Sequence, residues 1–152
     1  MGLSTHVLDT MHGTPAAGMR VALYTTDSAS PSAKATLVKQ FVLNSDGRNP
    51  DGMLYDHAAL KAGTYRLVFD VAGYFKARGV PLPEPAFLNQ VGLDFGVSDA
   101  TQHYHVPLVV SPCSYSTYRG SLITTVPRTS YPTESGRFCA KAKCRYKSPA
   151  PS

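Results

Sequence analysis

The sequence predicts an all-β protein, an antiparallel sandwich of about eight short strands with little helix. Three observations predict this fold class. Apolar and polar residues alternate with the two-residue period of a strand in several short runs, and clusters of Gly, Pro, Asn and Asp separate these runs. Only one short segment could form a helix. The 152 residues amount to one domain's length of chain.

The first two strands lie near the N-terminus. Residues 3–9 are expected to form the first strand, which the turn sequence at 13–15 closes. Residues 18–26 are expected to form the second. Because successive side chains of a strand point to opposite faces, positions 19, 21 and 23 share one face and positions 20, 22 and 24 the other.

Two further strands flank a dense turn. Residues 35–43 end in a cluster of Asn, Asp, Gly and Pro at 44–52, which is typical of turns. Residues 63–71 show the clearest alternation, with Leu67 and Phe69 on the apolar face and Arg66 on the polar one. The apolar face is expected to be buried.

The rest of the body contains the expected helix and three strands. Residues 73–80 are expected to form one or two helical turns, which the prolines at 81, 83 and 85 stop. Strands are then expected at 87–97 and 104–110, with a short one at 116–119.

The composition changes after Ser121. Nine basic and nine acidic residues balance up to Ser121, whereas residues 122–152 hold six basic residues and one acidic residue and so carry the whole net charge of +5. This stretch has scattered prolines and no hydrophobic period. We therefore expect a folded domain over residues 1–121 and a disordered basic extension over residues 122–152. A nucleic-acid partner is not expected, since the body itself is neutral.

Several features bear on location. No segment approaches the ~20 apolar residues of a membrane span, and the N-terminus has no pattern of a secretory signal. The number of cysteines is odd (Cys113, Cys139 and Cys144), which fits a reducing compartment. We expect a cytoplasmic protein with no membrane partner. A peroxisomal location is the alternative, although the chain ends in SPAPS rather than in a targeting tripeptide.

The last long strand carries polar side chains on its outer face. Its apolar face is the core face, so His103 and His105 point outward, as His6 does on the first strand. These histidines could simply be exposed to solvent. A His-x-His pair also has the spacing of two metal ligands, but no clear third and fourth ligand accompanies it, so no metal is expected.

Acid–base catalysis is the other interpretation of these histidines. Imidazole titrates near neutral pH, so it can take a proton from water and return one to a leaving group. Arg48 and Arg119 are candidate cations for stabilising a developing anion. Nucleophilic catalysis has little support, because Ser121 lies in no nucleophile-elbow motif and Cys113 has no activating partner.

Three groups of motifs together resemble a known family. They are L-S-T-H-V-L-D-T with G-T-P-A-A-G near the N-terminus, D-G-R at 46–48, and H-Y-H-V-P-L-V-V-S-P with Y-S-T-Y-R-G-S at the end of the body. Over about residues 3–121 the chain is similar to the 5-hydroxyisourate hydrolases, transthyretin-like enzymes of urate breakdown. The ending Tyr-Arg-Gly-Ser is the most specific motif, because the hormone carrier transthyretin shares the fold but lacks this ending and the histidines.

The resemblance implies a structure and an activity. The implied fold is a transthyretin-like (prealbumin-like) sandwich of eight strands in two sheets, assembled as a homotetramer with sites between its dimers. The implied reaction is hydrolysis of 5-hydroxyisourate to 2-oxo-4-hydroxy-4-carboxy-5-ureidoimidazoline without a cofactor. The implied catalytic residues are His6, Arg48, His105 and Ser121. The implied substrate-binding residues are His6, Arg48, Tyr118 and Arg119.

The chain departs from the family pattern after Ser121, where the family usually ends and 31 residues follow here. This extension could be a tolerated tail, a regulatory or localising appendage, or a misread gene end. Two other functions compete with the enzyme: a transthyretin-like carrier of a small ligand and a structural sandwich. The presence of His6, Arg48, His105 and Tyr118 favours the enzyme, since a carrier needs no acid–base groups.

Overall fold

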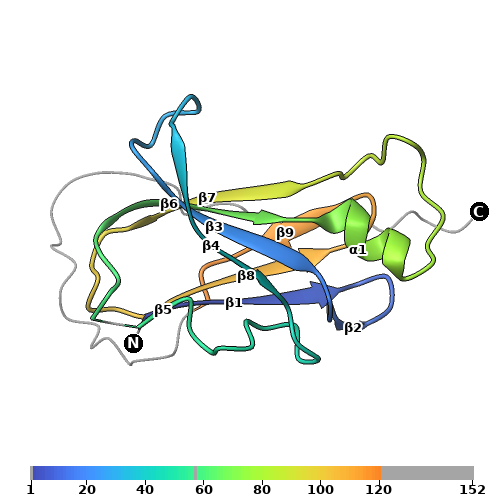
Figure 1. Cartoon of the computed structure of the whole chain (residues 1–152), viewed down its shortest axis with the longest axis horizontal. Coiled ribbons are helices and arrows are strands. Elements are labelled where there is room, and N and C mark those ends of the chain that lie inside the picture. Colours follow the sequence, from blue (N-terminus) through green and yellow to red (C-terminus); the bar gives the residue numbers. More distant parts are fainter. Residues whose placement is uncertain (1, 57, 121–152) are drawn as a thin grey trace, which may run out of the picture.

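The computed structural model describes residues 2–56 and 58–120. Within these ranges the chain forms nine strands and one helix: β1 (Gly2–Asp9), β2 (Thr14–Pro15), β3 (Arg20–Thr26), β4 (Ala35–Val42), β5 (Tyr55–Asp56), β6 (Gly63–Phe69), α1 (Val71–Ala77), β7 (Val91–Val97), β8 (Tyr104–Val110) and β9 (Tyr115–Thr117). Figure 1 shows the strands in two layers, with α1 at one end. The predicted all-β sandwich with one short helix is confirmed. Ser121 and the expected extension at 122–152 lie outside the described residues.

The two sheets have different strand orders. One runs β2-β1-β8-β9, with β5 also pairing with β1, and the other runs β4-β3-β6-β7. Every pairing is antiparallel except that of β1 with β8, which is parallel. The expectation of an antiparallel sandwich is therefore wrong for this one pair. Parallel neighbours need a crossover connection, and here the strands of the opposite sheet supply it.

Some element boundaries differ from the sequence predictions. The helix begins at Val71 rather than at residue 73, because the Asp70 side chain accepts a hydrogen bond from Gly73 N (3.0 Å) and caps it. The seventh strand begins at Val91 rather than at residue 87, and Phe87 is 76% exposed. Strands β2 and β5 are only two residues long and were not predicted. In the described part of the chain, no helix is long and apolar enough to cross a membrane.

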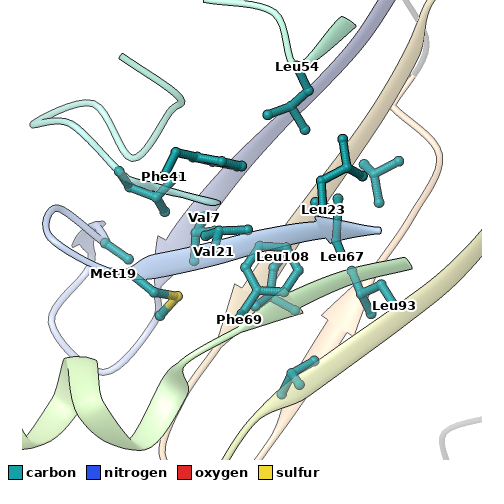
Figure 2. Packing of buried hydrophobic residues seen from close by; sticks show 14 of the residues in the cluster. Val7, Met19, Val21, Leu23, Phe41, Leu54, Leu67, Phe69, Leu93 and Leu108 are labelled. Carbon is teal, nitrogen blue, oxygen red and sulfur yellow. The ribbon is translucent and has the colours of Figure 1, made fainter. Parts of the chain in front are cut away.

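The core lies between the sheets and follows the predicted alternation. Val21 and Leu23 of β3 pack with Leu67 and Phe69 of β6 and with Leu108 of β8 from the opposite sheet (Figure 2). All five are buried. Burying such side chains contributes roughly 1.5–3 kcal/mol each. Because the inner faces of the two sheets pack on this common core, the side chains of the alternate positions point outward from each sheet.

A buried polar cluster joins the end of β1 to α1. Asp9 is fully buried and accepts hydrogen bonds from Tyr74 Oη (2.8 Å), His12 N (3.0 Å) and His12 Nδ1 (2.6 Å). The bond from His12 N shows that Asp9 caps the turn that follows β1. Burial raises the pKa of Asp9, but the hydrogen bonds from Tyr74 and His12 outweigh burial and the pKa is lowered overall. Burial and the bond to Asp9 raise the pKa of Tyr74 to about 12.

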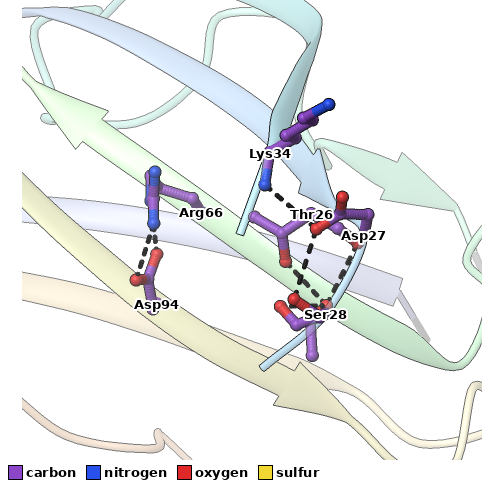
Figure 3. Close-up of polar contacts among 7 residues, drawn as sticks. Thr26, Asp27, Ser28, Lys34, Arg66 and Asp94 are labelled. Carbon is purple, nitrogen blue, oxygen red and sulfur yellow. Dashed lines mark hydrogen bonds and ion pairs between the residues drawn. The ribbon is translucent and has the colours of Figure 1, made fainter. Parts of the chain in front are cut away.

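The outer face of the β4-β3-β6-β7 sheet has its charges paired. Arg66 of β6 donates two hydrogen bonds to Asp94 of β7, at 2.6 and 3.0 Å, and nearby polar groups of the β3–β4 loop bond to one another (Figure 3). Arg20 is similarly paired with Asp70 at 2.6 Å. Because the partner carboxylates already neutralise these arginines, this face offers little free positive charge to a ligand.

Candidate active site

The outer face of the other sheet brings together most of the predicted site residues. In the parallel register of β1 and β8, Ser4 lies beside His105 and His6 lies beside Pro107. Ser4, His6 and His105 are half-buried, whereas the intervening residues Thr5 and Val106 are buried. The predicted outward direction of His6 and His105 is therefore confirmed. The two histidines come from strands that are about one hundred residues apart in the sequence.

A cavity of about 880 Å³ opens on this face. Arg48, His105, Tyr118 and Arg119 line it, together with His103, Ser4 and residues of the loop between β4 and β5. His6 is not among the lining residues, but it follows Ser4 on the same face of β1. Among the described residues Arg48 makes no ion pair, in contrast to the arginines of the opposite sheet. The cavity therefore combines imidazoles with an unneutralised guanidinium.

The loop that carries Arg48 is built as a tight turn on β1. Gly47 has a φ of +68°, a conformation that favours glycine, and its carbonyl accepts a hydrogen bond from Val7 N (3.0 Å). A Cβ on Gly47 would lie 2.6 Å from the Val7 carbonyl oxygen. The Asn44 side chain accepts from Arg48 N at 3.1 Å. The D-G-R sequence thus fixes the backbone of Arg48 beside His6.

Burial and positive charge keep the imidazoles neutral. Burial, then Arg48, His103 and His6 lower the pKa of His105. Burial and then Arg48 lower the pKa of His6, and an interaction with the Asp46 backbone opposes this shift. Because an imidazole accepts a proton only in its neutral form, both rings are prepared near neutral pH to act as bases or as neutral hydrogen-bond donors.

The segment after β9 closes one side of the cavity. Gly120 N donates to the His105 carbonyl oxygen (2.9 Å), and a Cβ on Gly120 would lie 2.5 Å from His105 Cδ2. Glycine at this position therefore leaves room for the His105 ring. Tyr118 is 60% exposed. The Arg119 guanidinium lies 4.4 Å from the centre of the Tyr104 ring and donates to Gln102 Oε1 (2.8 Å), which makes Arg119 part of the cavity wall.

Sequence reasoning missed two residues of the site. Ser4 Oγ lies 2.9 Å from His105 Nδ1 and 3.1 Å from His103 Nε2. Asn49 is buried in the cavity wall and donates to the carbonyl oxygens of Gly52 and Met53. Alternation could have found Ser4, because it shares the outer face of its strand with His6. For Asn49 the sequence predicted only that it lies in the turn cluster at 44–52, and no pattern pointed to a role in the site.

Comparison with known proteins identifies the family. Residues 3–120 match the sequence model described as "Transthyretin: HIUase/Transthyretin family". The chain belongs to this family. HIUase/transthyretin family membership fits the two-sheet architecture and the position of the Tyr-Arg-Gly sequence at the cavity.

Three relatives of this HIUase/transthyretin chain carry names or titles that describe enzymes. The chain is 53% identical to the 5-hydroxyisourate hydrolase of Deinococcus radiodurans over 122 residues, which cover 79% of this chain and 96% of the relative. It is 31% identical to the Klebsiella pneumoniae 5-hydroxyisourate hydrolase structure, with a TM-score of 0.62, covering 80% of this chain and 100% of that one. It is 42% identical to an (S)-allantoin synthase structure, with a TM-score of 0.71, covering 79% of this chain but only 43% of that longer chain.

The described residues were also compared with what a metal site needs. Within residues 2–56 and 58–120, no group of three or more His, Cys, Asp and Glu side chains lies close enough together to hold a metal ion. Cys113 is an exposed free thiol, and Cys139 and Cys144 lie outside the described residues. Among the described residues, the polar side chains that line the cavity carry imidazole, guanidinium, hydroxyl and amide groups.

Proposed function

We propose that this chain hydrolyses 5-hydroxyisourate to 2-oxo-4-hydroxy-4-carboxy-5-ureidoimidazoline in urate breakdown. One observation carries the proposal: His105 lines a cavity together with Arg48, which makes no ion pair among the described residues, and His6 lies on the same sheet face, in a chain about 50% identical to proteins named for this activity. Burial and Arg48 lower the pKa of both imidazoles. The substrate is a heterocycle with an electrophilic ring carbonyl and oxygens that attract a cation. The cavity has the groups that such a substrate needs.

In the proposed reaction, one of the two imidazoles, His6 or His105, takes a proton from water. The resulting hydroxide adds to the ring carbonyl, and the ring C–N bond then breaks. Arg48 holds the substrate oxygens and stabilises the negative charge of the tetrahedral intermediate. Positioning and charge stabilisation of this kind need no covalent intermediate with the protein.

The remaining predicted residues have supporting roles in this proposal. Tyr118 hydrogen-bonds the substrate from the exposed side of the cavity, and Arg119 holds the cavity wall against Tyr104. Ser121 assists proton transfer. It directly follows Gly120, which contacts His105, although Ser121 itself lies outside the described residues. We propose no cofactor for the reaction.

The assembly and location form part of the proposal. We propose a homotetramer of two dimers, with each cavity facing the channel between the dimers, in the cytoplasm. Met53 and Tyr118 are exposed at this cavity, and exposed apolar side chains of this kind are ones that a second dimer would cover. Sedimentation of the full-length chain would test the assembly, and a monomer at micromolar concentration would contradict it.

The experiment that tests the activity is the ultraviolet decay of freshly generated 5-hydroxyisourate, with and without full-length protein. Acceleration by catalytic amounts is the expected result. A chain that ends at Ser121 serves as the comparison for the effect of residues 122–152. If both chains bind a substrate analogue but neither accelerates decay, the chain is a carrier and the proposed function is wrong.

A further inference from the structure

A single hydroxyl group links two imidazoles at the cavity. Ser4 Oγ lies 2.9 Å from His105 Nδ1 and 3.1 Å from His103 Nε2, and the two rings are stacked at 6.5 Å with an angle of 15° between their planes. A serine hydroxyl has one proton to donate and two lone pairs to accept with. Ser4 Oγ makes no other hydrogen bond to the described residues, so its own proton has an acceptor there only if Ser4 donates to one ring and accepts from the other. The direction of this chain of bonds therefore fixes where each ring carries its proton.

His103 decides the direction. Its Nδ1 is buried and has no hydrogen-bond partner in the described part of the chain. If Ser4 donated to His103 Nε2, the proton of a neutral His103 would be on Nδ1, as a buried N–H without an acceptor. Buried donors without partners are rarer in proteins than acceptors with unused lone pairs. The favoured arrangement is therefore His103 Nε2–H donating to Ser4 Oγ.

The same bond chain then determines the state of His105. Ser4 Oγ–H donates to His105 Nδ1, so a neutral His105 carries its proton on Nε2. This nitrogen has no hydrogen bond to the described residues and is not among the buried unpartnered atoms, so it is the one left for a ligand in the cavity. We propose that Ser4 is a positioning residue that fixes His105 as an Nε2–H donor toward the substrate and leaves His6 as the base. This inference rests on the proposed function.

The assignment divides the chemistry between the two histidines. His6 takes a proton from water as the C–O bond forms at the ring carbonyl. His105 Nε2–H and Arg48 hydrogen-bond the oxygen that becomes negatively charged. When the ring C–N bond breaks, His6 returns its proton to the leaving nitrogen and is neutral again, and the new carboxylic acid releases a proton to solvent. His105 transfers no proton, because a neutral imidazole that lost one would become an imidazolate.

Nitrogen-15 spectra of the full-length protein with labelled histidine test the assignment without turnover. Slightly above neutral pH, His105 should show a protonated Nε2 and an unprotonated Nδ1. Ser4→Ala should remove this preference and give a mixture of tautomers, whereas Ser4→Thr, which keeps the hydroxyl, should retain it. A wild-type His105 protonated on Nδ1 would overturn the inference. The spectra need no substrate, so they report the tautomer of His105 whether or not the protein is active. A wild type without activity in the decay assay would contradict the proposed function, but it would not change the tautomer that the spectra show.

Kinetics of matched glutamine variants give the second test. A glutamine amide can donate a hydrogen bond but cannot take a proton, so His105→Gln should lose about tenfold in kcat, whereas His6→Gln should lose about a thousandfold. The acid limb of the kcat/KM profile should persist in His105→Gln, since His6 is the group that titrates. Ser4→Ala should lower kcat about tenfold with KM unchanged, as expected when a positioning interaction is lost. Equal losses in the two glutamine variants would refute the division of roles.

Discussion

Gly120 gives the sharpest test of how the site is built. Its φ lies outside the region that requires glycine, so alanine suits the backbone, but the added Cβ would lie 2.5 Å from His105 Cδ2 and 3.0 Å from His105 Cβ. Ordinary contact begins at 3.4 Å. The ring and the new methyl group must therefore separate by about 0.9 Å, the difference between 3.4 and 2.5 Å.

The expected cost falls on catalysis more than on stability. A misplacement of about 1 Å in a catalytic group can lower the rate about a hundredfold, so Gly120→Ala should lower kcat/KM by about that factor. The half-buried His105 ring can shift toward the open cavity, so the free energy of unfolding should fall by no more than about 1 kcal/mol. The assay is 5-hydroxyisourate decay with full-length protein, together with urea unfolding of the same samples.

A matched glycine supplies the control. Gly92 lies on β7, its φ is also outside the left-handed region, and a Cβ there would meet no atom within 4 Å. Gly92→Ala should therefore keep the wild-type kcat/KM. If Gly120→Ala also kept wild-type activity, the reasoning that this glycine makes room for a catalytic ring would be refuted.

Three further predictions follow from the site and the core. Arg48→Ala should lower kcat/KM roughly a hundredfold or more in the decay assay, because it removes the cation that stabilises the intermediate; an unchanged rate would remove Arg48 from the mechanism. Burial and Arg48 lower the pKa of His6 below 6.5, so more than half of His6 is neutral at pH 6.5. kcat/KM should therefore exceed half of its plateau value at pH 6.5 and should fall as the pH drops through the lowered pKa, which a pH–rate profile would measure; a half-maximal point above pH 6.5 would contradict this. Asp9→Asn should lower the free energy of unfolding by roughly 2–3 kcal/mol in urea, because three donors converge on the buried carboxylate; an unchanged midpoint would show that the cluster adds no stability.

The strand faces could be predicted because alternation is a local property. Leu67 and Phe69 were expected inside and His105 outside, and each is placed so by the two-residue period that a half-buried strand imposes. The strands that were missed, β2 and β5, are too short to show any period. The parallel pairing of β1 with β8 could not be predicted, because strand neighbours depend on how the whole chain crosses between sheets.

The site could be predicted in part for the same reasons. Alternation and family motifs pointed to His6, Arg48 and His105. The role of Ser4 depends on the register that places it opposite His105, which no local pattern encodes. The need for glycine at position 120 likewise depends on the short distance between this residue and the His105 side chain on β8. Contacts of this kind become visible only when strands distant in the sequence are placed side by side.

The pairing of β1 with β8 also has a consequence for biosynthesis. Ser4 and His105 are 101 residues apart, so the first strand of the chain meets its partner only after almost the whole body has been translated. Until then one edge of β1 has no neighbour, and the nascent chain exposes backbone groups that could pair with another polypeptide. The active site is thus among the last features to form, and a ribosome that stalls before residue 104 releases a chain without it.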